Sequence, residues 1–375
     1  MKIGINLLSI VTGGAEIYVI KLIKNLAMID KENQYEVFIS QEKRGQFDVD
    51  QHNFKFIELS SKLSIPYYRI IWEQTILPVI LKKNKIDILF SSGNIDILFS
   101  PCKTVITIQV IQPFSVPEMF PSKMKLYYLR AMIRLSSKMA DKIITVSTTT
   151  KNELIKYLGV SSSKIVSVYH GVDTHPNVLS ESEIKRKFGI RKDYILSISS
   201  VYKFKNYVSL IRGFKILRER YDQNYQLVIV GKHIETDYYL QMLRTIDELC
   251  LTHEVILIDG VPHDETYLLY SGANLYVFPS YCETFGMTQI EAMACGIPVV
   301  TSNISVMPEI CADAAIYFDP SNPNDIAEKM NQVLASENLR NKLVNNGLKR
   351  ARYFSWEKSA IEHLSVFEEV YRTGR

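Results

Sequence analysis

The sequence predicts an α/β protein of two doubly wound, Rossmann-like domains that face a central cleft. The chain has 375 residues, which suits two domains at ~100–200 residues each. Short runs rich in β-branched residues alternate with amphipathic segments along the whole chain, which favours parallel sheets covered by helices on both faces. The alternation pauses once, in the turn-rich segment 171–177, and then restarts. We therefore expect domains at 1–175 and 176–356.

The first domain is expected to contain seven strands and several helices. Its strands are predicted at Lys2–Leu8, Tyr35–Ile39, Phe54–Leu59, Ile86–Phe90, Thr104–Gln109, Lys142–Ser147 and Lys164–Tyr169. Its helices are predicted at Glu16–Met28, Tyr67–Lys82, Lys123–Met139 and Thr149–Leu158. The strands are short apolar, often β-branched runs, whereas the helices repeat apolar residues every three or four positions.

The second domain repeats this alternation. Strands are predicted at Tyr194–Ser199, Gln226–Val230, Val255–Ile258 and Leu275–Pro279, and helices at Tyr207–Arg220, Tyr238–Cys250 and Glu265–Ser271. Doubly wound sheets bind ligands at the carboxyl ends of their strands. Two such domains therefore offer two opposed binding edges.

The composition excludes several classes of protein. Hydrophobic residues make up 47% of the chain and charged residues 22%, which excludes a disordered chain and a collagen-like repeat. The five cysteines form no Cys-x-x-Cys pair, which argues against a zinc ribbon or a disulfide framework and favours a reducing cytoplasm. The longest apolar stretch, 70–81, is interrupted by polar residues and is shorter than the ~20 residues of a membrane-spanning helix. We expect neither a spanning nor a targeting segment.

The small net charge of +4 hides an uneven distribution. Residues 1–175 hold 22 basic and 15 acidic side chains, a balance of +7, whereas residues 176–375 hold 22 and 25, a balance of −3. This asymmetry indicates that the first half meets an acidic partner.

Much of the positive excess lies between Lys123 and Lys142. This segment holds six cations against the single carboxylate of Asp141, interleaved with methionine, leucine and tyrosine. A basic amphipathic helix of this kind suits an anionic membrane surface. A core helix with a basic outer face fits equally well. Nucleic acid is not an expected partner, because no recognisable reader module accompanies the patch.

The most informative stretch of the chain is 278–300. A strand is expected to end at Ser280, and a helix to begin near Met287 and to stop at Gly296. The first N–H groups of this helix then point outward at the carboxyl edge of the sheet, where they suit a diphosphate.

Two carboxylates flank this anion site. Glu283 precedes the helix and Glu291 lies within its first two turns. A carboxylate can accept hydrogen bonds from two vicinal hydroxyl groups, which a sugar or a ribose presents.

The Glu283-x7-Glu291 segment, with its Phe-Gly, Glu-Ala-Met-Ala-Cys-Gly and Pro-Val-Val surroundings, resembles the signature of the retaining GT-B glycosyltransferases of the large group-1 family (glycosyltransferase family 4). The resemblance covers nearly the whole chain. It implies that Glu283 binds the hydroxyl groups of the donor sugar and that Glu291 binds the nucleotide ribose. It also implies that the sugar and the diphosphate meet the amides of Phe285, Gly286, Met287 and Thr288.

The resemblance implies a cationic side chain as well. Lys205 follows the first strand of the second domain, where a lysine can neutralise the leaving nucleotide diphosphate in place of a metal ion. The family usually has an arginine five residues earlier, but this chain has Ser200. Either Lys203 supplies the second cation or Lys205 acts alone. Ser200 and Val261 are also expected to line the donor site.

The first domain carries weaker features of the same family. Gly13 and Gly14 follow the first strand, allow a ligand to approach the backbone closely, and resemble the family's loop that faces phosphate and acceptor, with Glu16 just beyond it. His170 opens a His-Gly-Val-Asp segment that resembles the family's interdomain motif, so we expect a hinge or cleft wall rather than a general base. By the same resemblance the final helix, 357–375, crosses back to the first domain.

The chain departs from the family at Gln109 and Val110, where many relatives have His-Asp. Neither residue can act as an acid or a base. Gln109 is a candidate for orienting the acceptor, with a structural role as the alternative. Retaining transfer by a same-face route needs no strong base, because the departing phosphate oxygen can accept the acceptor's proton.

No metal site or cofactor is expected. Asp48 and Asp50 form an Asp-x-Asp pair, which in another class of sugar transferases would hold Mn²⁺ or Mg²⁺, but the pair lies in a polar loop far in sequence from 278–300. No histidine or cysteine cluster has the spacing of metal ligands.

These features predict a metal-independent retaining glycosyltransferase. It would move a sugar from a nucleotide diphosphate donor to a glycan or a polyprenyl- or lipid-linked glycan, in the synthesis of a cell-surface polysaccharide such as lipopolysaccharide or capsule. It would act in the cytoplasm or at the inner face of the cytoplasmic membrane. The alternatives are a nucleotide-sugar epimerase, a phosphorylase, or a non-catalytic protein that binds nucleotide sugars.

Overall fold

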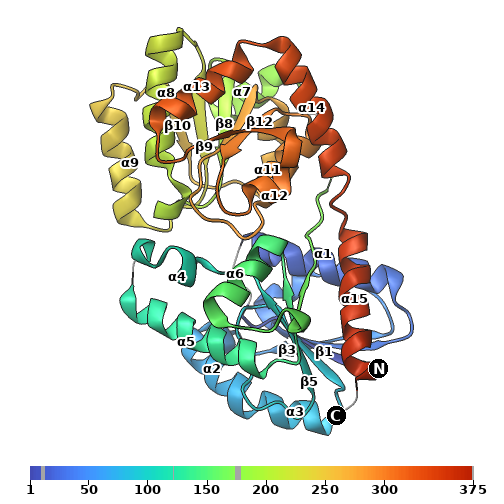
Figure 1. The fold of residues 1–375 in the computed structure, drawn as a ribbon. Coiled ribbons are helices and arrows are strands. Elements are labelled where there is room, and N and C mark those ends of the chain that lie inside the picture. The colour runs from blue at the N-terminus through green and yellow to red at the C-terminus, as the bar shows by residue number, and fades with distance from the viewer. Residues whose placement is uncertain (10–12, 121, 174–178, 374–375) are drawn as a thin grey trace. The chain divides into compact units, whose positions relative to one another are not determined.

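The computed structural model describes residues 1–9, 13–120, 122–173 and 179–373. The chain divides into two compact units, unit 1 (Met1–Gly171 with Phe354–Arg375) and unit 2 (Val172–Tyr353). The division falls after Gly171 rather than after residue 175, and the chain returns to unit 1 at Phe354 rather than at residue 357. Each unit holds one parallel sheet with helices on both faces (Figure 1), which confirms the predicted fold class.

Unit 1 contains a seven-stranded sheet in the order β3-β2-β1-β4-β5-β6-β7. Neighbouring strands of this sheet pair in parallel throughout the described residues. The strands are β1 (Lys2–Asn6), β2 (Gln34–Ser40), β3 (Phe54–Leu59), β4 (Ile88–Ser91), β5 (Lys103–Ile108), β6 (Lys142–Thr145) and β7 (Ile165–Ser167). They match the seven predicted strands in number and order.

The helices of unit 1 cover both faces of this sheet. They are α1 (Gly14–Ile29), α2 (Pro66–Thr75), α3 (Leu77–Lys83), α4 (Gln112–Ser115), α5 (Lys123–Met139), α6 (Thr148–Leu158) and α15 (Trp356–Arg372). Successive side chains of a strand point to opposite faces. Thus Leu89 of β4 packs in a cluster with Leu81 of α3, whereas its neighbour Phe90 lies 5.2 Å, ring centre to ring centre, from Phe367 of α15.

The predicted single helix Tyr67–Lys82 is wrong, because the structure divides this segment into α2 and α3 at Ile76. Pro78 lies at the start of α3. Proline has no backbone N–H and its ring collides with the preceding turn, so it is tolerated at the first turn of a helix but not in its interior. The apolar periodicity continues across Pro78 and conceals this break.

The C-terminal helix α15 belongs to unit 1, as the resemblance implied (Figure 1, red). His363 of α15 is fully buried; its Nδ1 lies 2.7 Å from Ser359 O and its Nε2 lies 2.6 Å from the hydroxyl of Tyr18 in α1. A carbonyl oxygen only accepts, so Nδ1 carries the proton and Nε2 accepts the hydrogen bond from Tyr18. The Tyr18 oxygen also lies 3.1 Å from Thr107 Oγ1 of β5. This buried chain of hydrogen bonds attaches α15 to the sheet.

Unit 2 contains a six-stranded sheet in the order β10-β9-β8-β11-β12-β13. Its strands are β8 (Tyr194–Ile198), β9 (Gln226–Val230), β10 (Val255–Ile258), β11 (Leu275–Phe278), β12 (Val299–Ser302) and β13 (Ala315–Phe318). Its helices are α7 (Glu181–Phe188), α8 (Tyr207–Tyr221), α9 (Thr236–Glu248), α10 (His263–Ser271), α11 (Met287–Ala294), α12 (Met307–Cys311), α13 (Pro323–Leu334) and α14 (Glu337–Ala351).

A buried apolar cluster of unit 2 lies where α8, α9 and α13 pack on one face of the sheet. It includes Phe214 of α8, Met242 of α9, Met330 of α13 and Val277 of β11. Each of these side chains is fully buried. This packing holds the strands rigid, so that the loops at their carboxyl ends have a fixed base.

In both sheets the strand order reverses once, between β1 and β4 in unit 1 and between β8 and β11 in unit 2. Doubly wound sheets bind ligands outside the carboxyl ends of the strands at such a reversal. None of the helices described by the structure is long and apolar enough to cross a membrane.

The buried His363, which attaches α15, predicts that unit 1 loses stability in acid. Burial lowers the pKa of His363 to about 4, below its ordinary value near 6.5, so only the unfolded chain takes up a proton between those values. The free energy of unfolding is therefore complete above about pH 6.5 and falls as the pH decreases towards 4. We expect this slope between pH 6 and 5 to be smaller by about 1 kcal/mol per pH unit in His363→Gln than in the unmodified protein.

Tryptophan fluorescence during urea unfolding measures this slope. The two tryptophans, Trp72 and Trp356, both lie in unit 1. Equal slopes for the variant and the unmodified protein would show that His363 is not held neutral.

Candidate functional site

The candidate site of unit 2 is centred on a buried ion pair between Lys205 and Glu283. Lys205 ends a short 3₁₀ helix (Lys203–Lys205) after β8, and Glu283 lies in the loop after β11. These strands are the neighbours between which the strand order reverses. The side chains of Lys205 and Glu283 are only 12% and 10% exposed. Two candidate residues that lie 78 positions apart in the sequence are therefore in direct contact.

Asn206 fixes the backbone beside Lys205. It adopts the left-handed conformation with φ 62°, which asparagine tolerates better than most residues. Its buried amide donates to Pro279 O at 3.1 Å and to Pro320 O at 2.7 Å. These bonds join the loop after β8 to the end of β11. The Lys205 ammonium also lies 5.3 Å from the centre of the Phe278 ring, close enough for a cation–π attraction.

Ser305 holds the backbone of Glu283. The Glu283 N–H donates to Ser305 Oγ at 3.1 Å, and this hydroxyl donates back to Glu283 O at 2.8 Å. Ser305 follows β12 and has φ 57°. The sequence analysis missed this residue, because a single serine 22 positions away along the chain carries no local motif.

The helix α11 begins where it was predicted, directly after Gly286. Gly286 has φ 80° and ψ 52°, and a Cβ atom there would lie 2.4 Å from Gln289 Nε2. The positive φ favours glycine at this position, and a Cβ atom there would force the Gln289 side chain to move. Gly286, Met287 and Thr288 are partly exposed, whereas Phe285 is buried. The first N–H groups of a helix have no partners within it, and an anion bound at the start of α11 stays a prediction.

Glu291 is 4% exposed and points into a second group of side chains. The Tyr270 hydroxyl donates to Glu291 Oε2 at 3.0 Å, and His263 Nε2 lies 3.9 Å from Oε1. Burial raises the pKa of Glu291 to about 7, and the negative charge of Asp173 adds to this rise. A carboxyl group with this pKa binds or releases a proton near neutral pH.

Tyr276 of β11 is buried and interacts electrostatically with both carboxylates. Its hydroxyl donates to Ile198 O at 3.2 Å. Burial raises its pKa far above the usual value near 10, and the charges of Glu291 and Glu283 raise it further. Glu283, Glu291 and the start of α11 therefore belong to one site at the carboxyl edge of the unit 2 sheet.

The remaining donor-side candidates lie at the rim of this edge. Ser200 is partly exposed in the turn after β8, and Val261 is partly exposed in the turn after β10. Lys203 is exposed, and its backbone N–H donates to Glu235 Oε2 at 3.0 Å. The ion pair with Glu283 is made by Lys205, so these two lysines occupy different surroundings.

In unit 1, Gly13 is the N-cap residue immediately before α1 and has φ 97°, a conformation that favours glycine. Its carbonyl accepts hydrogen bonds from Glu16 N at 2.9 Å and Ile17 N at 3.1 Å. The Glu16 carboxylate forms an ion pair with Lys43 at 3.1 Å. Gly14 is the first residue of α1.

Gln109 makes structural contacts at the end of β5. Its side-chain amide donates to Ser92 O at 2.9 Å. Its backbone N–H and that of Val110 both donate to Asn94 Oδ1, at 2.6 and 2.9 Å. Gln109 therefore joins the loop after β5 to the loop after β4. An additional role in orienting the acceptor stays a prediction.

His170 is buried at the end of unit 1, with its ring centre 4.6 Å from that of Tyr18 and 5.8 Å from that of Trp356. Burial lowers its pKa to about 3, and the neighbouring His363 lowers it further. His170 therefore stays neutral at physiological pH. Its side chain belongs to the core that holds α15, while its position next to the unit boundary suits the predicted hinge.

The sequence analysis missed a buried carboxylate beside the unit 1 reversal. Glu73 of α2 accepts a hydrogen bond from the Asn6 amide at 2.9 Å and lies 3.8 Å from Arg69 Nε. Asn6 Oδ1 accepts from Leu8 N at 3.1 Å, and Arg69 donates to Leu8 O at 3.4 Å. Together these groups bind the backbone N–H and the backbone carbonyl of Leu8, where the chain leaves β1. A glutamate in an otherwise apolar stretch was the available signal.

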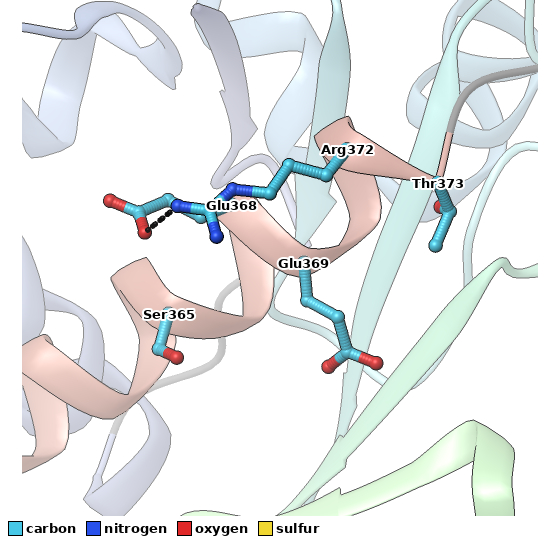
Figure 2. Close-up of a pocket in the computed structure, with 5 residues that line it drawn as sticks. All are labelled: Ser365, Glu368, Glu369, Arg372 and Thr373. Carbon is cyan, nitrogen blue, oxygen red and sulfur yellow. Dashed lines mark hydrogen bonds and ion pairs between the residues drawn. The ribbon is translucent and has the colours of Figure 1, made fainter.

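Within the described part of the chain, no group of three or more His, Cys, Asp and Glu side chains is arranged to hold a metal ion. Asp48 and Asp50 are exposed in the loop before β3. Figure 2 shows a separate surface hollow on the last turns of α15, where Arg372 pairs with Glu368 at 3.4 Å. None of the predicted site residues lines this hollow.

Two family descriptions match the chain and together span most of it. "Glycosyl transferases group 1" matches residues 180–350, and "Glycosyltransferase Family 4" matches residues 12–175. Among curated relatives, the O-antigen chain mannosyltransferase B of Escherichia coli is 27% identical over 71% of this chain and 70% of its own length. The O-antigen chain mannosyltransferase RfbU of Salmonella typhimurium is 31% identical over 57% of this chain and 56% of its own length.

Solved structures share the fold. Anabaena Alr3699/HepE in complex with UDP-glucose superposes with a TM-score of 0.78 at 18% identity, over 98% of this chain and 100% of its own. WaaG, described as a glycosyltransferase involved in lipopolysaccharide biosynthesis, gives 0.72 at 16% identity, over 96% and 98%. At these identities the likeness shows the GT-B fold that the sequence predicts.

The raised pKa of Glu291 predicts a pH-dependent effect of its replacement. Between about pH 4.5 and 7 the folded protein keeps a proton that the unfolded chain releases, so the free energy of unfolding falls as the pH rises through this range. Glu291→Gln removes the group that binds this proton, so the free energy of unfolding of the variant does not fall for this reason as the pH rises. We expect the variant, relative to the unmodified protein, to gain about 2 kcal/mol more at pH 8 than at pH 5. Urea unfolding followed by circular dichroism measures the difference, and Glu265→Gln, which replaces a more exposed carboxylate, should show no such gain.

The conformation of Gly286 predicts a second stability difference. Gly286→Ala places a methyl group against Gln289 in addition to the strain of positive φ, and we expect a loss of about 2 kcal/mol or more. Gly189→Ala is the matched control, because Gly189 has φ 68° with nothing within 4 Å of its Cβ position, and about 1 kcal/mol is expected there. Equal losses in urea unfolding would contradict the contact with Gln289.

Proposed function

The chain belongs to the group-1 glycosyltransferases (glycosyltransferase family 4), and on this premise we propose how it transfers a sugar. The proposed donor is a nucleotide diphosphate sugar, and the proposed acceptor is a glycan or a lipid-linked glycan of a cell-surface polysaccharide. The reaction is proposed to be retaining and to need neither a metal ion nor a cofactor. The observation that carries the proposal is the buried Lys205–Glu283 pair beside the start of α11.

Lys205 is proposed to neutralise the leaving diphosphate. Its ammonium is paired with Glu283. When a diphosphate binds at the start of α11, the ammonium can exchange the carboxylate for a phosphate oxygen and remain paired. A fixed cation in a partly buried site stabilises the negative charge that develops on the leaving group. The ion pair thus holds the Lys205 ammonium close to the proposed position of the diphosphate.

Glu283 is proposed to bind the hydroxyl groups of the donor sugar. Once Lys205 turns to the diphosphate, the Glu283 carboxylate has oxygen atoms free to accept hydrogen bonds. Ser305 holds its backbone in place during this exchange. Glu291, next to Tyr270 and His263, is proposed to accept hydrogen bonds from the nucleotide ribose. Ser200, Lys203 and Val261 are proposed to line the rim of the donor site.

The proposed chemical step uses no protein base. The bond between the anomeric carbon and the phosphate oxygen breaks, and the bond to the acceptor oxygen forms on the same face of the sugar. The acceptor's proton moves to the departing phosphate oxygen. Gln109 and Val110, which stand where many relatives have His-Asp, do not need to supply a base in such a step. The Gly13–Gly14 loop and Glu16 are proposed to face the acceptor.

The nature of the relatives supports a polysaccharide acceptor. The two curated relatives described above are named O-antigen chain mannosyltransferases, and a structural neighbour is described as acting in lipopolysaccharide biosynthesis. None of these proteins is an epimerase or a phosphorylase. A lipid-linked acceptor at the inner face of the cytoplasmic membrane agrees with the positive charge of residues 1–175.

The experiment that tests the proposal is a transfer assay with UDP-, GDP- and ADP-sugars in the presence of EDTA. We expect one donor to be consumed at a rate that EDTA does not lower, and NMR of the product to show the anomeric configuration of the donor. Loss of activity with EDTA would overturn the metal-independent mechanism. Inversion at the anomeric carbon would overturn the same-face step. The absence of both binding and transfer with every donor would overturn the proposal that this protein transfers a sugar.

Replacement of Glu283 and replacement of Lys205 should have different effects on turnover and on nucleotide affinity. We expect Glu283→Gln to lower turnover by about 10²–10³-fold, because it removes a charge that acts on the reacting sugar, while the affinity for the nucleotide diphosphate changes by less than about threefold. Lys205→Ala should weaken nucleotide binding by about tenfold or more as well as turnover, because the diphosphate loses its cation and Glu283 stays buried without a partner.

A matched control is Lys192→Ala, which breaks the ion pair between Lys192 and Glu254. These residues precede β8 and β10 and therefore lie at the opposite edge of the same sheet. Its turnover and nucleotide affinity should equal those of the unmodified protein. Equal effects of Glu283→Gln and Lys205→Ala on nucleotide binding would show that the two roles are wrongly assigned.

A further inference from the structure

We infer that Glu235, in the loop after β9, is a positioning residue for Lys205, because its carboxylate holds the turn Lys203–Lys205 in place. Glu235 acts through the backbone of this turn rather than through a contact with the donor. The inference rests on the proposed function only for the role of Lys205 at the diphosphate. The sequence analysis did not single out Glu235.

The loops after β8 and β9 are joined beyond the ends of these strands. Val201 forms an isolated parallel bridge with His233. The Val201 N–H donates to Lys232 O at 2.9 Å, and the Glu235 N–H donates to Val201 O at 3.2 Å. The backbone of Glu235 is therefore fixed against the segment that leads into the turn of Lys205.

The Glu235 carboxylate closes the amino end of this turn. The Lys203 N–H donates to Glu235 Oε2 at 3.0 Å. Two later N–H groups are bonded within the segment, Lys205 N to Tyr202 O at 2.9 Å and Asn206 N to Lys203 O at 3.2 Å. The first N–H groups of a helical turn have no such partner. A carboxylate makes a charge-assisted hydrogen bond there, which is stronger than a neutral one. Glu235 thus supplies a bond that the turn cannot make by itself.

The same turn is held from its other side by the segment after β11. The Tyr281 N–H donates to Phe204 O at 2.8 Å, and Ser280 Oγ donates to the same oxygen at 3.1 Å. These donors follow β11 and Glu235 follows β9, which are the two neighbours of β8 in the sheet. Lys205 is the last residue of the turn between them. Removal of the Glu235 carboxylate would therefore release one side of the turn and with it the fixed position of the Lys205 ammonium.

The surroundings of Glu235 favour a functional role over a stabilising one. Glu235 occupies the N-cap position of α9, but within the described residues its side chain makes no capping hydrogen bond to that helix. Its Oε1 is out of reach of solvent and has no hydrogen-bond partner in the part of the chain that the structure describes. A buried acceptor without a partner lowers stability. The one hydrogen bond that this carboxylate does make goes to the turn of Lys205.

The charge of Glu235 also acts on the residue that precedes the turn. Burial raises the pKa of Tyr202, and the negative charge of Glu235 raises it further. Tyr202 is the N-cap residue of the turn, and its ring stacks on Phe204 at 5.2 Å between ring centres. The carboxylate is thus close to the turn by its electrostatic effect as well as by its hydrogen bond.

Calorimetric titration of the full chain with nucleotides tests the inference. Glu235→Ala removes the hydrogen bond to the Lys203 N–H, and we expect its affinity for the nucleoside diphosphate that the unmodified protein binds (UDP, GDP or ADP) to fall by about tenfold. Affinity for the corresponding monophosphate should change by less than about threefold, because the monophosphate lacks the terminal phosphate on which the leaving charge develops. Glu235→Gln keeps an oxygen acceptor for the Lys203 N–H and should stay within about threefold for both nucleotides.

A double-mutant cycle separates the positioning of Lys205 from a general effect on the loop. In a chain that carries Lys205→Ala, the further change Glu235→Ala should lower diphosphate affinity by less than about twofold, because no ammonium remains to be positioned. Two independent losses that multiply in the double variant would overturn the inference. Equal losses for the diphosphate and the monophosphate would overturn it as well.

Asp237→Ala is the matched control. Asp237 is an exposed carboxylate two residues after Glu235, in the first turn of α9. This variant should bind the diphosphate as the unmodified protein does. A loss equal to that of Glu235→Ala would assign the effect to the negative charge of the loop and would contradict the role of the hydrogen bond to Lys203.

NMR of the lysine ε-methylene groups separates this inference from the proposed function, because it needs no donor. In protein labelled with ¹³C at lysine Cε, the signal of Lys205 is identified by its absence in Lys205→Ala. We expect Glu235→Ala to move this signal, and Glu235→Gln and Asp237→Ala to leave it in place. If the protein binds a diphosphate but Glu235→Ala leaves the signal unchanged, the inference is wrong and the proposed function stands. If the signal moves but no donor is bound or consumed, the proposed function is wrong and Glu235 still positions Lys205.

Discussion

The buried ion pair between Lys205 and Glu283 is the interaction on which the candidate site depends. Each side chain is about nine-tenths buried, so the loss of either one would leave the other without a partner where little water reaches it. The pair also ties the loop after β8 to the loop after β11, across the reversal of strand order. Asn206 and Ser305 then fix the backbone on either side. The loops of the candidate site are thus held together around two opposite charges.

Unit 1 uses its buried polar groups differently. Asn6, Arg69 and Glu73 hold the chain where it leaves β1, and Thr107, Tyr18 and His363 attach the C-terminal helix. In unit 2 the polar groups are concentrated around the carboxylates of Glu283 and Glu291. This difference agrees with the proposed division of labour, in which unit 2 binds the charged donor and unit 1 carries the proposed acceptor loop.

Much of the fold could be predicted because parallel α/β units have strong local patterns. Short β-branched runs and amphipathic repeats located the strands and most helices, and the Gly286 and Gly296 glycines located the ends of α11. The error at Tyr67–Lys82 has a local cause as well, since the apolar period continues through Pro78 although the backbone hydrogen bonds cannot. Lys142, the last cation of the basic segment 123–142, begins β6, as the predicted strand Lys142–Ser147 has it.

The sequence by itself determined the two α/β units, the glycine and carboxylate positions of 278–300, and the excess of positive charge before residue 175. Those features depend on residue type and short spacing, which a linear pattern records. Only the tertiary structure decided that Lys205 pairs with Glu283, that Ser305 holds the Glu283 backbone, and that burial raises the pKa of Glu291 to about 7. It also decided that the tyrosines of α2 face outward while Glu73 faces inward. These properties arise from contacts between distant segments, and neither side chain of such a contact reveals its partner along the chain.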